Sequence, residues 1–217
     1  YSYFDVTFDP STEGNKSATV TIANNDLDEN PFTFEITGSS VIPNVAPTVT
    51  NPVVTGDLVV GQTLTGTYAF SDGDNDPESG SAYQWYMADD ANGNNKAAIS
   101  GATGTTYVLT SDHVGKYFSF EVTPSDGQVF GTAQESSLQG PVSKIAQSIT
   151  FNALDAKTYG DDDFELTASA SSNLTGTYTS SNTNVATVSG STVSIVGAGE
   201  TIITASQAGN DSYSAAT

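Results

Sequence analysis

The chain has 217 residues, with 25 acidic side chains, five lysines, one histidine and neither arginine nor cysteine, and its formal charge is -20 at pH 7. Five scattered lysines cannot neutralise a run of phosphates, so this composition argues against nucleic-acid binding. No apolar run approaches the roughly 18 residues of a membrane-spanning helix. The lack of cysteine excludes disulfides, zinc–thiolate sites and cysteine nucleophiles.

Short segments of alternating apolar and polar residues follow one another along the chain, with clusters of Gly, Asn, Asp, Ser and Pro between them. Helical periodicity is almost absent. Many short strands at a spacing of roughly 8–12 residues are typical of β-sandwiches, so we expect an all-β fold. The predicted strands are 4–8, 17–22, 32–36, 62–70, 82–87, 105–109, 117–123, 165–170, 175–179, 192–196 and 201–205.

Two segments have the composition of linkers. Residues 39–52 contain Pro43, Pro47 and Pro52, and proline favours an extended, stiff connection over a helix. The second segment is Gly140–Lys144. These linkers predict three units, 1–43, 44–144 and 145–217. The first is too short to bury a core and reads as the C-terminal half of a sandwich. The third ends without an obvious closing strand, so we expect that it lacks its last strand and that the sequence is a fragment of a longer protein.

The middle unit carries the most specific pattern. Its one tryptophan, Trp85, shares a strand face with Tyr83, and Asp112–Tyr117 has the Asp-x-x-Gly-x-Tyr order of a tyrosine corner. A tryptophan on the third strand and such a corner before the sixth are features of immunoglobulin-like sandwiches. The Tyr117 hydroxyl is expected to bond back to upstream backbone. His113 is expected to point to solvent, and Phe118 to face away from Trp85 and Tyr117.

The middle unit therefore resembles the immunoglobulin-like repeats of bacterial surface adhesins, through Val60-Gly61-Gln62-Thr63-Leu64, the strand around Trp85, Ile99–Thr103 and Tyr107–Tyr117. The first unit is similar to the C-terminal half of the choice-of-anchor D domain, through Phe4–Pro10 and Asn24–Gly38. The third resembles bacterial immunoglobulin group 2 and mucin-binding-type (MBG) repeats, through Thr158–Asp161, Ser180–Val188 and Gly197–Ala205. The resemblance implies tandem immunoglobulin-like β-sandwiches.

Acidic loops are the best candidates for a functional site. Asp72, Asp74, Asp76 and Glu78 stand at alternate positions of a glycine-containing loop, a spacing at which carboxylates converge on Ca²⁺. Asp89 and Asp90, in the next loop, could add oxygens at the same end of the sandwich. The pattern departs from the EF-hand loop, and a solvated turn is the equal alternative, because Asp, Asn and Gly favour turns by themselves.

Two further acidic runs give weaker signals. Asp26 and Asp28 are weaker calcium candidates in a loop of the first unit. The run Asp161–Asp163 reads as a solvated turn.

The sequence offers little for catalysis. No Ser-His-Asp set forms around His113, there is no glycine-rich phosphate loop, and we expect no enzyme activity. Paired carboxylates are abundant, so a hydrolase remains a third option if the fold provides a concave pocket. Six aromatic residues could form a sugar-binding platform, although core and corner positions explain them better: Tyr83, Trp85, Tyr86, Tyr107, Tyr117 and Phe118.

The expected function is a stalk or repeat region of a large secreted or cell-surface bacterial adhesin. The resemblance extends to adhesins of gliding motility, and calcium is expected to stiffen the stalk. Its expected partners are neighbouring immunoglobulin-like domains of the same long chain, with surface glycans or surface proteins as further candidates. Neither nucleic acid nor a membrane span is expected. The alternative is a carbohydrate-binding accessory module of a secreted enzyme.

Overall fold

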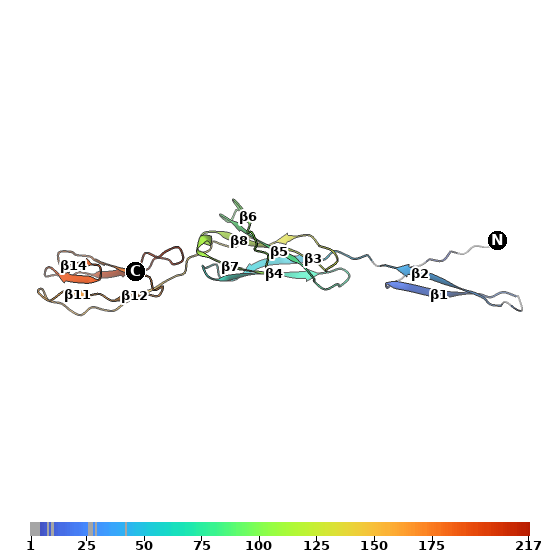
Figure 1. The fold of residues 1–217 in the computed structure, drawn as a ribbon, viewed down its shortest axis with the longest axis horizontal. Coiled ribbons are helices and arrows are strands. Elements are labelled where there is room, and N and C mark those ends of the chain that lie inside the picture. The colour runs from blue at the N-terminus through green and yellow to red at the C-terminus, as the bar shows by residue number, and fades with distance from the viewer. Residues whose placement is uncertain (1–4, 8, 10, 26–27, 29, 42) are drawn as a thin grey trace.

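The computed structural model describes residues 5–7, 9, 11–25, 28, 30–41 and 43–217. The described part is nearly all β, and its strands form three groups in a row along the long axis of the molecule (Figure 1). The expected all-β class is therefore confirmed. Among the described residues no helix is both long enough and apolar enough to cross a membrane.

The N-terminal group contains two strands, the central group seven and the C-terminal group seven, in the part of the chain that the structure describes. The first group is β1 (Gly14–Ile22) and β2 (Phe32–Ser40). The central group is β3 (Thr48–Thr55), β4 (Thr63–Ser71), β5 (Ala82–Ala88), β6 (Ala97–Ala98), β7 (Thr106–Val108), β8 (Tyr117–Thr123) and β9 (Gln134–Glu135). The third is β10 (Ile149–Phe151), β11 (Phe164–Glu165), β12 (Ala168–Ala170), β13 (Thr177–Ser180), β14 (Ala186–Ser189), β15 (Thr192–Ile195) and β16 (Ile203–Ser206).

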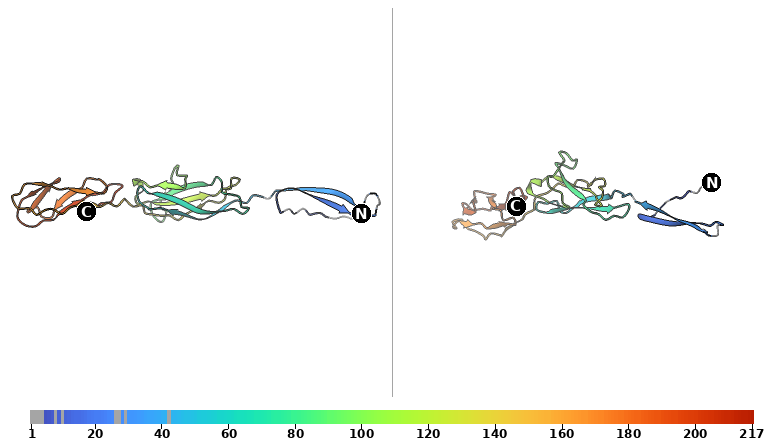
Figure 2. Two further views of the ribbon diagram at one scale, coloured as in Figure 1. Left: turned by 90° about the horizontal axis from the view of Figure 1, so that it is seen from below. Right: turned by 45° about the vertical axis from the view of Figure 1, so that its right-hand side comes forward.

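The N-terminal group is a two-stranded antiparallel hairpin, with Ile22 opposite Phe32 and Gly14 opposite Ser40. One face carries apolar side chains from both strands, and Phe32 is 52% exposed there. Figure 2 shows the hairpin separate from the central sheets. The predicted strand 4–8 includes residues outside the described part of the chain, and the described residues 5–7 there have no strand structure.

The central group is a sandwich of two sheets, β3-β4-β7 and β6-β5-β8-β9. Side chains alternate between the two faces of a strand, so β8 sends Phe118, Phe120 and Val122 into the space between the sheets, where all three are fully buried. Trp85 stands opposite Phe120 in the ladder and is also fully buried. Its indole N–H donates to the carbonyl of Gly104 over 2.9 Å, so burial leaves no polar atom of the ring unsatisfied.

The prediction that Phe118 faces away from Trp85 was wrong. The Phe118 side chain lies in the core, and the neighbouring Tyr117 side chain lies on the opposite face of β8. No hydrogen bond of the Tyr117 hydroxyl occurs among the described residues, and the Tyr117 ring instead lies against Gly140, where an added Cβ would be 2.6 Å from a ring carbon. The predicted backbone bond of this corner is therefore replaced by ring packing.

The prediction that His113 points to solvent was also wrong, because its side chain is half-buried. Its Nδ1 accepts a 2.9 Å hydrogen bond from the Thr110 backbone, and its ring packs edge-on against Phe118 at 5.2 Å between centroids. Because Nδ1 is an acceptor, the neutral ring carries its proton on Nε2, which lies 3.2 Å from the Tyr107 hydroxyl. Aromatic contact, not solvation, holds this side chain.

The predicted linker 39–52 is shorter than its prolines indicate. β2 continues to Ser40, and β3 begins at Thr48 and contains Pro52. The β3–β4 ladder shifts register between Thr50 and Val53, where Asn51 has a φ of 52°. Proline is tolerated at such a bulge, because no ladder hydrogen bond is required from its nitrogen.

The C-terminal group consists of small sheets, β10-β12, β11-β15-β14 and β13-β16, packed around Leu166, Ala186 and Val193. The predicted single strand 165–170 is divided into β11 and β12, which pair with different sheets. In Figure 1 this group lies at the left, with the C-terminal end beside its strands. Its buried core is small by comparison with that of the central sandwich.

The chain crosses from the central to the C-terminal group within a few residues. Ser143 still belongs to the central group, because its N–H donates to Leu58 O over 2.8 Å. Ile145 already belongs to the next group, because its N–H donates to Ser212 O and its carbonyl accepts from Ser214 N. The Ile145 side chain nevertheless packs against the central core. Lys144 is thus the single residue between two hydrogen-bonded positions, and its Nζ donates to the Asn210 carbonyl.

Candidate functional site

The acidic loop between β4 and β5 folds around its first aspartate. Asp72 Oδ1 accepts from the backbone N–H groups of Asp74 and Asp76, at 3.0 and 3.2 Å. Such side-chain to backbone bonds are the local reason that Asp favours turns. The predicted carboxylates therefore lie on one tight loop, as the sequence indicates.

The four predicted ligands do not all point to one place. Glu78 Oε1 accepts hydrogen bonds from the Tyr68 hydroxyl at 2.5 Å and from Ser81 Oγ at 2.6 Å. Asp76 Oδ2 accepts from Gln128 Nε2 at 2.8 Å. Burial, and then the Glu78 carboxylate, raise the pKa of Tyr68 above its ordinary value, so the phenol remains a donor to Glu78. Glu78 is therefore engaged with tyrosine and serine rather than with the aspartates.

Two buried oxygens of this loop have no hydrogen-bond partner among the described residues. Asp72 Oδ2 and Asp74 Oδ1 are buried and accept no hydrogen bond from the residues that the structure describes. A buried polar atom without a partner costs about 1–3 kcal/mol, and a cation would offset that cost. Across the described ranges, no group of three or more His, Cys, Asp or Glu side chains is gathered closely enough to hold a metal ion.

Asp89 and Asp90 lie at the opposite end of β5 from the loop of Asp72, not at the same end of the sandwich as predicted. Their loop follows the end of β5, whereas the loop of Asp72 precedes its start, so a seven-residue strand of roughly 20 Å separates them. Asp89 bonds Lys116 Nζ at 2.6 Å and Asn95 Nδ2 at 2.7 Å, and the bond from Lys116 is the main cause that lowers its pKa. Backbone N–H groups of Asn92 and Asn94 occupy Asp90 Oδ1. The two loops do not form a joint site.

Among the described residues, the remaining acidic candidates give no cluster. Asp26 lies outside the described residues, and Asp28 does not belong to any described group that could hold a metal ion. In the run Asp161–Asp163, Asp161 Oδ2 accepts from the Thr158 backbone at 2.8 Å, which makes it part of a turn.

The acidic end of the sandwich holds the connection to the N-terminal hairpin, which the sequence did not indicate. Asp74 Oδ2 accepts from the Val45 backbone at 3.0 Å, and Asp126 Oδ2 accepts from Asn44 Nδ2 at 2.8 Å. Gly73 permits this approach, since a Cβ there would lie 2.9 Å from Val45 Cγ1. Backbone N–H groups of Val129 and Gln128 also bond Asp126, and together with Asn44 they lower its pKa.

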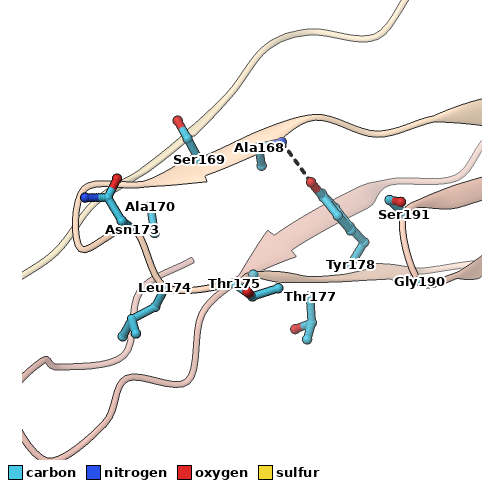
Figure 3. Close-up of a pocket in the computed structure, with 11 residues that line it drawn as sticks. Ala168, Ser169, Ala170, Asn173, Leu174, Thr175, Thr177, Tyr178, Gly190 and Ser191 are labelled. Atoms are coloured by element: carbon cyan, nitrogen blue, oxygen red, sulfur yellow. Dashed lines mark hydrogen bonds between the residues drawn. The ribbon is translucent and has the colours of Figure 1, made fainter.

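A groove between β12 and β13 is a further concave feature (Figure 3). The Tyr178 hydroxyl points across it and accepts a 2.8 Å hydrogen bond from the Ala168 N–H. The Tyr178 ring packs against Phe151 at 5.7 Å between centroids. Tyr178 thus ties two strands of different sheets together, and the polar side chains of Ser169, Asn173 and Thr175 remain at the groove.

These features define the central group as an immunoglobulin-like β-sandwich, with a buried tryptophan between two antiparallel sheets. Residues 48–134 match the family model described as the AIR9 A9 domain, an immunoglobulin-like family. The adhesin-type resemblance of this segment is thereby supported at the level of an immunoglobulin-like domain. No match to a curated protein was found.

Proposed function

We propose that the chain is a spacer from the repeat region of a large secreted or cell-surface bacterial adhesin. In this proposal 44–144 and 145–217 are neighbouring immunoglobulin-like sandwiches in tandem, and 1–43 is the C-terminal half of another. The resemblance of the repeats favours an extracellular location and extends to adhesins of gliding motility. The proposal assigns the chain no catalysis, and its partners are adjacent domains of the same long protein.

The short junction between the central and C-terminal groups carries this proposal. With Ser143 bonded to one group and Ile145 to the other, the backbone has only Lys144 in which to bend. Ile145 also adds side-chain packing against the central core. A stalk must keep successive domains in a fixed relation, and a connection of this kind does so without a flexible linker.

Distance measurements on the whole chain test the spacer. Because the chain lacks cysteine, Thr67→Cys and Thr187→Cys provide two unique spin-label positions on exposed strand faces of the two groups. We expect one narrow distance distribution, which broadens when a flexible Gly-Ser insert of about six residues follows Lys144. A control pair within the central sandwich, Thr67→Cys with Asn92→Cys, should not respond to the insert. A broad distribution in the uninserted chain would contradict a rigid spacer.

Calcium at the acidic loop is the second element of the proposal. The two buried, unpartnered oxygens of Asp72 and Asp74 support it, and the same loop holds Val45 of the N-terminal connection. A cation there would stiffen the junction to the hairpin. Binding at 100 times the dissociation constant would stabilise the fold by about 2.7 kcal/mol.

Thermal unfolding in 1 mM CaCl₂ and in chelator, at matched ionic strength, tests this element. The melting temperature should rise with Ca²⁺, and Asp72→Asn combined with Asp74→Asn should abolish the rise. Asp89→Asn, at the other end of β5, is the control that should keep it. An unchanged melting temperature with Ca²⁺ would refute calcium binding and leave a solvated turn.

The alternative function is carbohydrate binding by an accessory module of a secreted enzyme. The open groove beside Tyr178, with its hydroxyl and amide side chains, is the observation that favours it. A glycan array separates the two functions, because a spacer should bind no glycan. If a glycan binds and Asn173→Ala removes the binding, the alternative replaces the spacer.

A further inference from the structure

The chain enters the central sandwich at one end and leaves it at the other. The hairpin and the C-terminal group lie on opposite sides of the sandwich along the long axis of the molecule (Figures 1 and 2). The entrance segment, 48–60, begins with β3, and the exit segment, 134–143, begins with β9. Tension along the chain therefore reaches the sandwich through these two segments and runs close to the direction of its strands.

Both segments run from the hairpin end of the sandwich to the junction end. β3 starts at the hairpin connection and pairs antiparallel with β4. The exit segment is antiparallel to β8, with Gln134 opposite Val122 and Gln139 opposite Phe118. A strand of eight residues already spans about 26 Å, so tension gains almost no length by straightening β3. Tension does work only where the chain lengthens, which here requires the two segments to slide past each other.

The entrance and exit segments are joined in a parallel bridge between Val59 and Ser143. The Val60 N–H donates to the Ser143 carbonyl at 3.0 Å, and the Ser143 N–H donates to the Leu58 carbonyl at 2.8 Å. The Ser143 hydroxyl donates to the same Leu58 carbonyl at 3.1 Å. Tension pulls Leu58 toward the hairpin and Ser143 toward the C-terminal group. These bonds lie across the direction of sliding, so they are loaded at the same time.

The exit segment is also bonded along its other side. The Val142 N–H donates to the Lys116 carbonyl at 3.0 Å, and the Val142 carbonyl accepts from the Gly115 N–H at 2.9 Å. Gln139 exchanges two backbone bonds with Phe118, both at 2.8 Å. The Val142 side chain belongs to the buried core. The exit segment therefore cannot leave the entrance segment without breaking bonds on both sides.

We propose that the pairing of 58–60 with the exit segment is a mechanical clamp, which keeps the central sandwich folded under tension along the chain. Separating an antiparallel pair from one end breaks its bonds one after another, whereas sliding breaks the bonds of the clamp together. The resistance of the sandwich therefore depends on the direction of the force. The clamp goes beyond the spacer function, because a chain that is rigid without load could still unfold under a weak pull.

Stretching single molecules of the whole chain in optical tweezers tests the clamp. The chain lacks cysteine, so handles attach only at introduced cysteines, placed at exposed residues. Val41→Cys with Thr150→Cys pulls along the axis, through both segments. Val41→Cys with Ser71→Cys pulls at the end where Thr48 pairs with Ser71, and separates β3 from β4 one pair after another.

We expect the axial unfolding force to be at least about twice the force that separates β3 from β4 at the same loading rate, because ladder bonds across the load must break together. The length gained on axial unfolding identifies the event. It should be on the order of 300 Å for the central sandwich, at about 3.5 Å per residue.

A pair of matched proline variants locates the clamp. Ser143→Pro removes the N–H that donates to Leu58, and it should lower the axial force by roughly a third or more while the force that separates β3 from β4 stays unchanged. Ser137→Pro alters another exposed serine of the exit segment, whose N–H donates no hydrogen bond among the described residues. This control should leave both forces unchanged. Circular dichroism spectra of both variants check that the fold is retained.

Three results would overturn the proposal. The first is an axial force no higher than the force that separates β3 from β4. The second is the same axial force in Ser143→Pro and Ser137→Pro. The third is an equal loss of both forces in Ser143→Pro, which would mean general destabilisation instead of a lost clamp. The distance test of the spacer measures the chain without load, so the two proposals can fail separately.

Discussion

His113 is the one histidine of the chain, so its titration can be followed by NMR without ambiguity. Desolvation lowers its pKa, and the nearby Asp112 carboxylate opposes that shift. The neutral ring is also the form that accepts the Thr110 N–H and reaches the Tyr107 hydroxyl. The hydrogen bond from the Thr110 N–H therefore depends on a ring without charge.

A pH-dependent loss of stability follows from the lowered pKa of His113. Above the unfolded-state pKa of about 6.5, both states are neutral and the stability is fully present. As pH falls below that value toward the folded pKa, the unfolded chain takes up the proton first, so the free energy of unfolding decreases. We expect the melting temperature to fall between about pH 7 and 5 more in the native chain than in His113→Gln. Equal slopes for the two proteins would contradict this.

Gly66 occupies the middle of β4 for a steric reason. A Cβ at this position would lie 2.4 Å from carbons of the Phe120 ring, which is fully buried and cannot move aside. Gly66→Ala should therefore destabilise the chain by about 1–3 kcal/mol, as overpacked cores do. Thr67→Ala, on the exposed face next to it, should stay within about 0.5 kcal/mol. Urea unfolding followed by tryptophan fluorescence reports directly on this core, because Trp85 lies against Phe120 at 5.2 Å between ring centroids.

At the scale of strands, the sequence predicts best where one face is buried and one is solvated. β5 and β8 show this alternation, and the predicted ranges 82–87 and 117–123 match them closely. The first half of β3 fell inside the predicted linker 39–52 because of the prolines there, and the bulge at Thr50–Val53 makes Pro52 compatible with a strand. The predicted orientation of Phe118 was wrong because the corner motif was given more weight than the alternation of large apolar residues at Phe118, Phe120 and Val122.

The candidate site shows the same limit. Carboxylate spacing correctly indicates a tight loop, yet spacing cannot show that Glu78 turns to Tyr68, ten residues earlier. Spacing also cannot show that Asp74 and Asp126 accept hydrogen bonds from the segment that follows the hairpin. The donors, Val45 and Asn44, are 29 and 82 residues away in sequence. Long-range partners decide which carboxylate oxygens remain available for a cation.

The β1–β2 hairpin is predicted to be the least protected paired element of the described chain. Two-stranded hairpins are marginally stable in water, and the apolar face of this one is exposed at Phe32 and Ile22. Hydrogen exchange by mass spectrometry should show its amides exchanging orders of magnitude faster than those of β5 and β8, which lie over the buried core. Exchange as slow as that of β8 would mean that the hairpin face is covered in solution.

At the scale of the whole molecule, like charges dominate. The chain carries 25 acidic side chains against five lysines, and the described residues form ion pairs between Lys96 and Glu135 and between Lys116 and Asp89. Both pairs are partly exposed, and such pairs contribute little to stability. Self-repulsion of the remaining carboxylates opposes the compact state.

Salt should therefore stabilise this protein rather than weaken it. Raising NaCl from about 10 to 300 mM shortens the Debye length to well under 10 Å and screens carboxylates that are far apart. We expect the melting temperature of the central sandwich to rise by about 4–8 °C, which corresponds to about 1 kcal/mol for a domain of its size. A fall in melting temperature would mean that the two ion pairs outweigh the repulsion. Repeating the series with CaCl₂ at equal ionic strength separates screening, which any cation supplies, from occupation of the loop at Asp72 and Asp74.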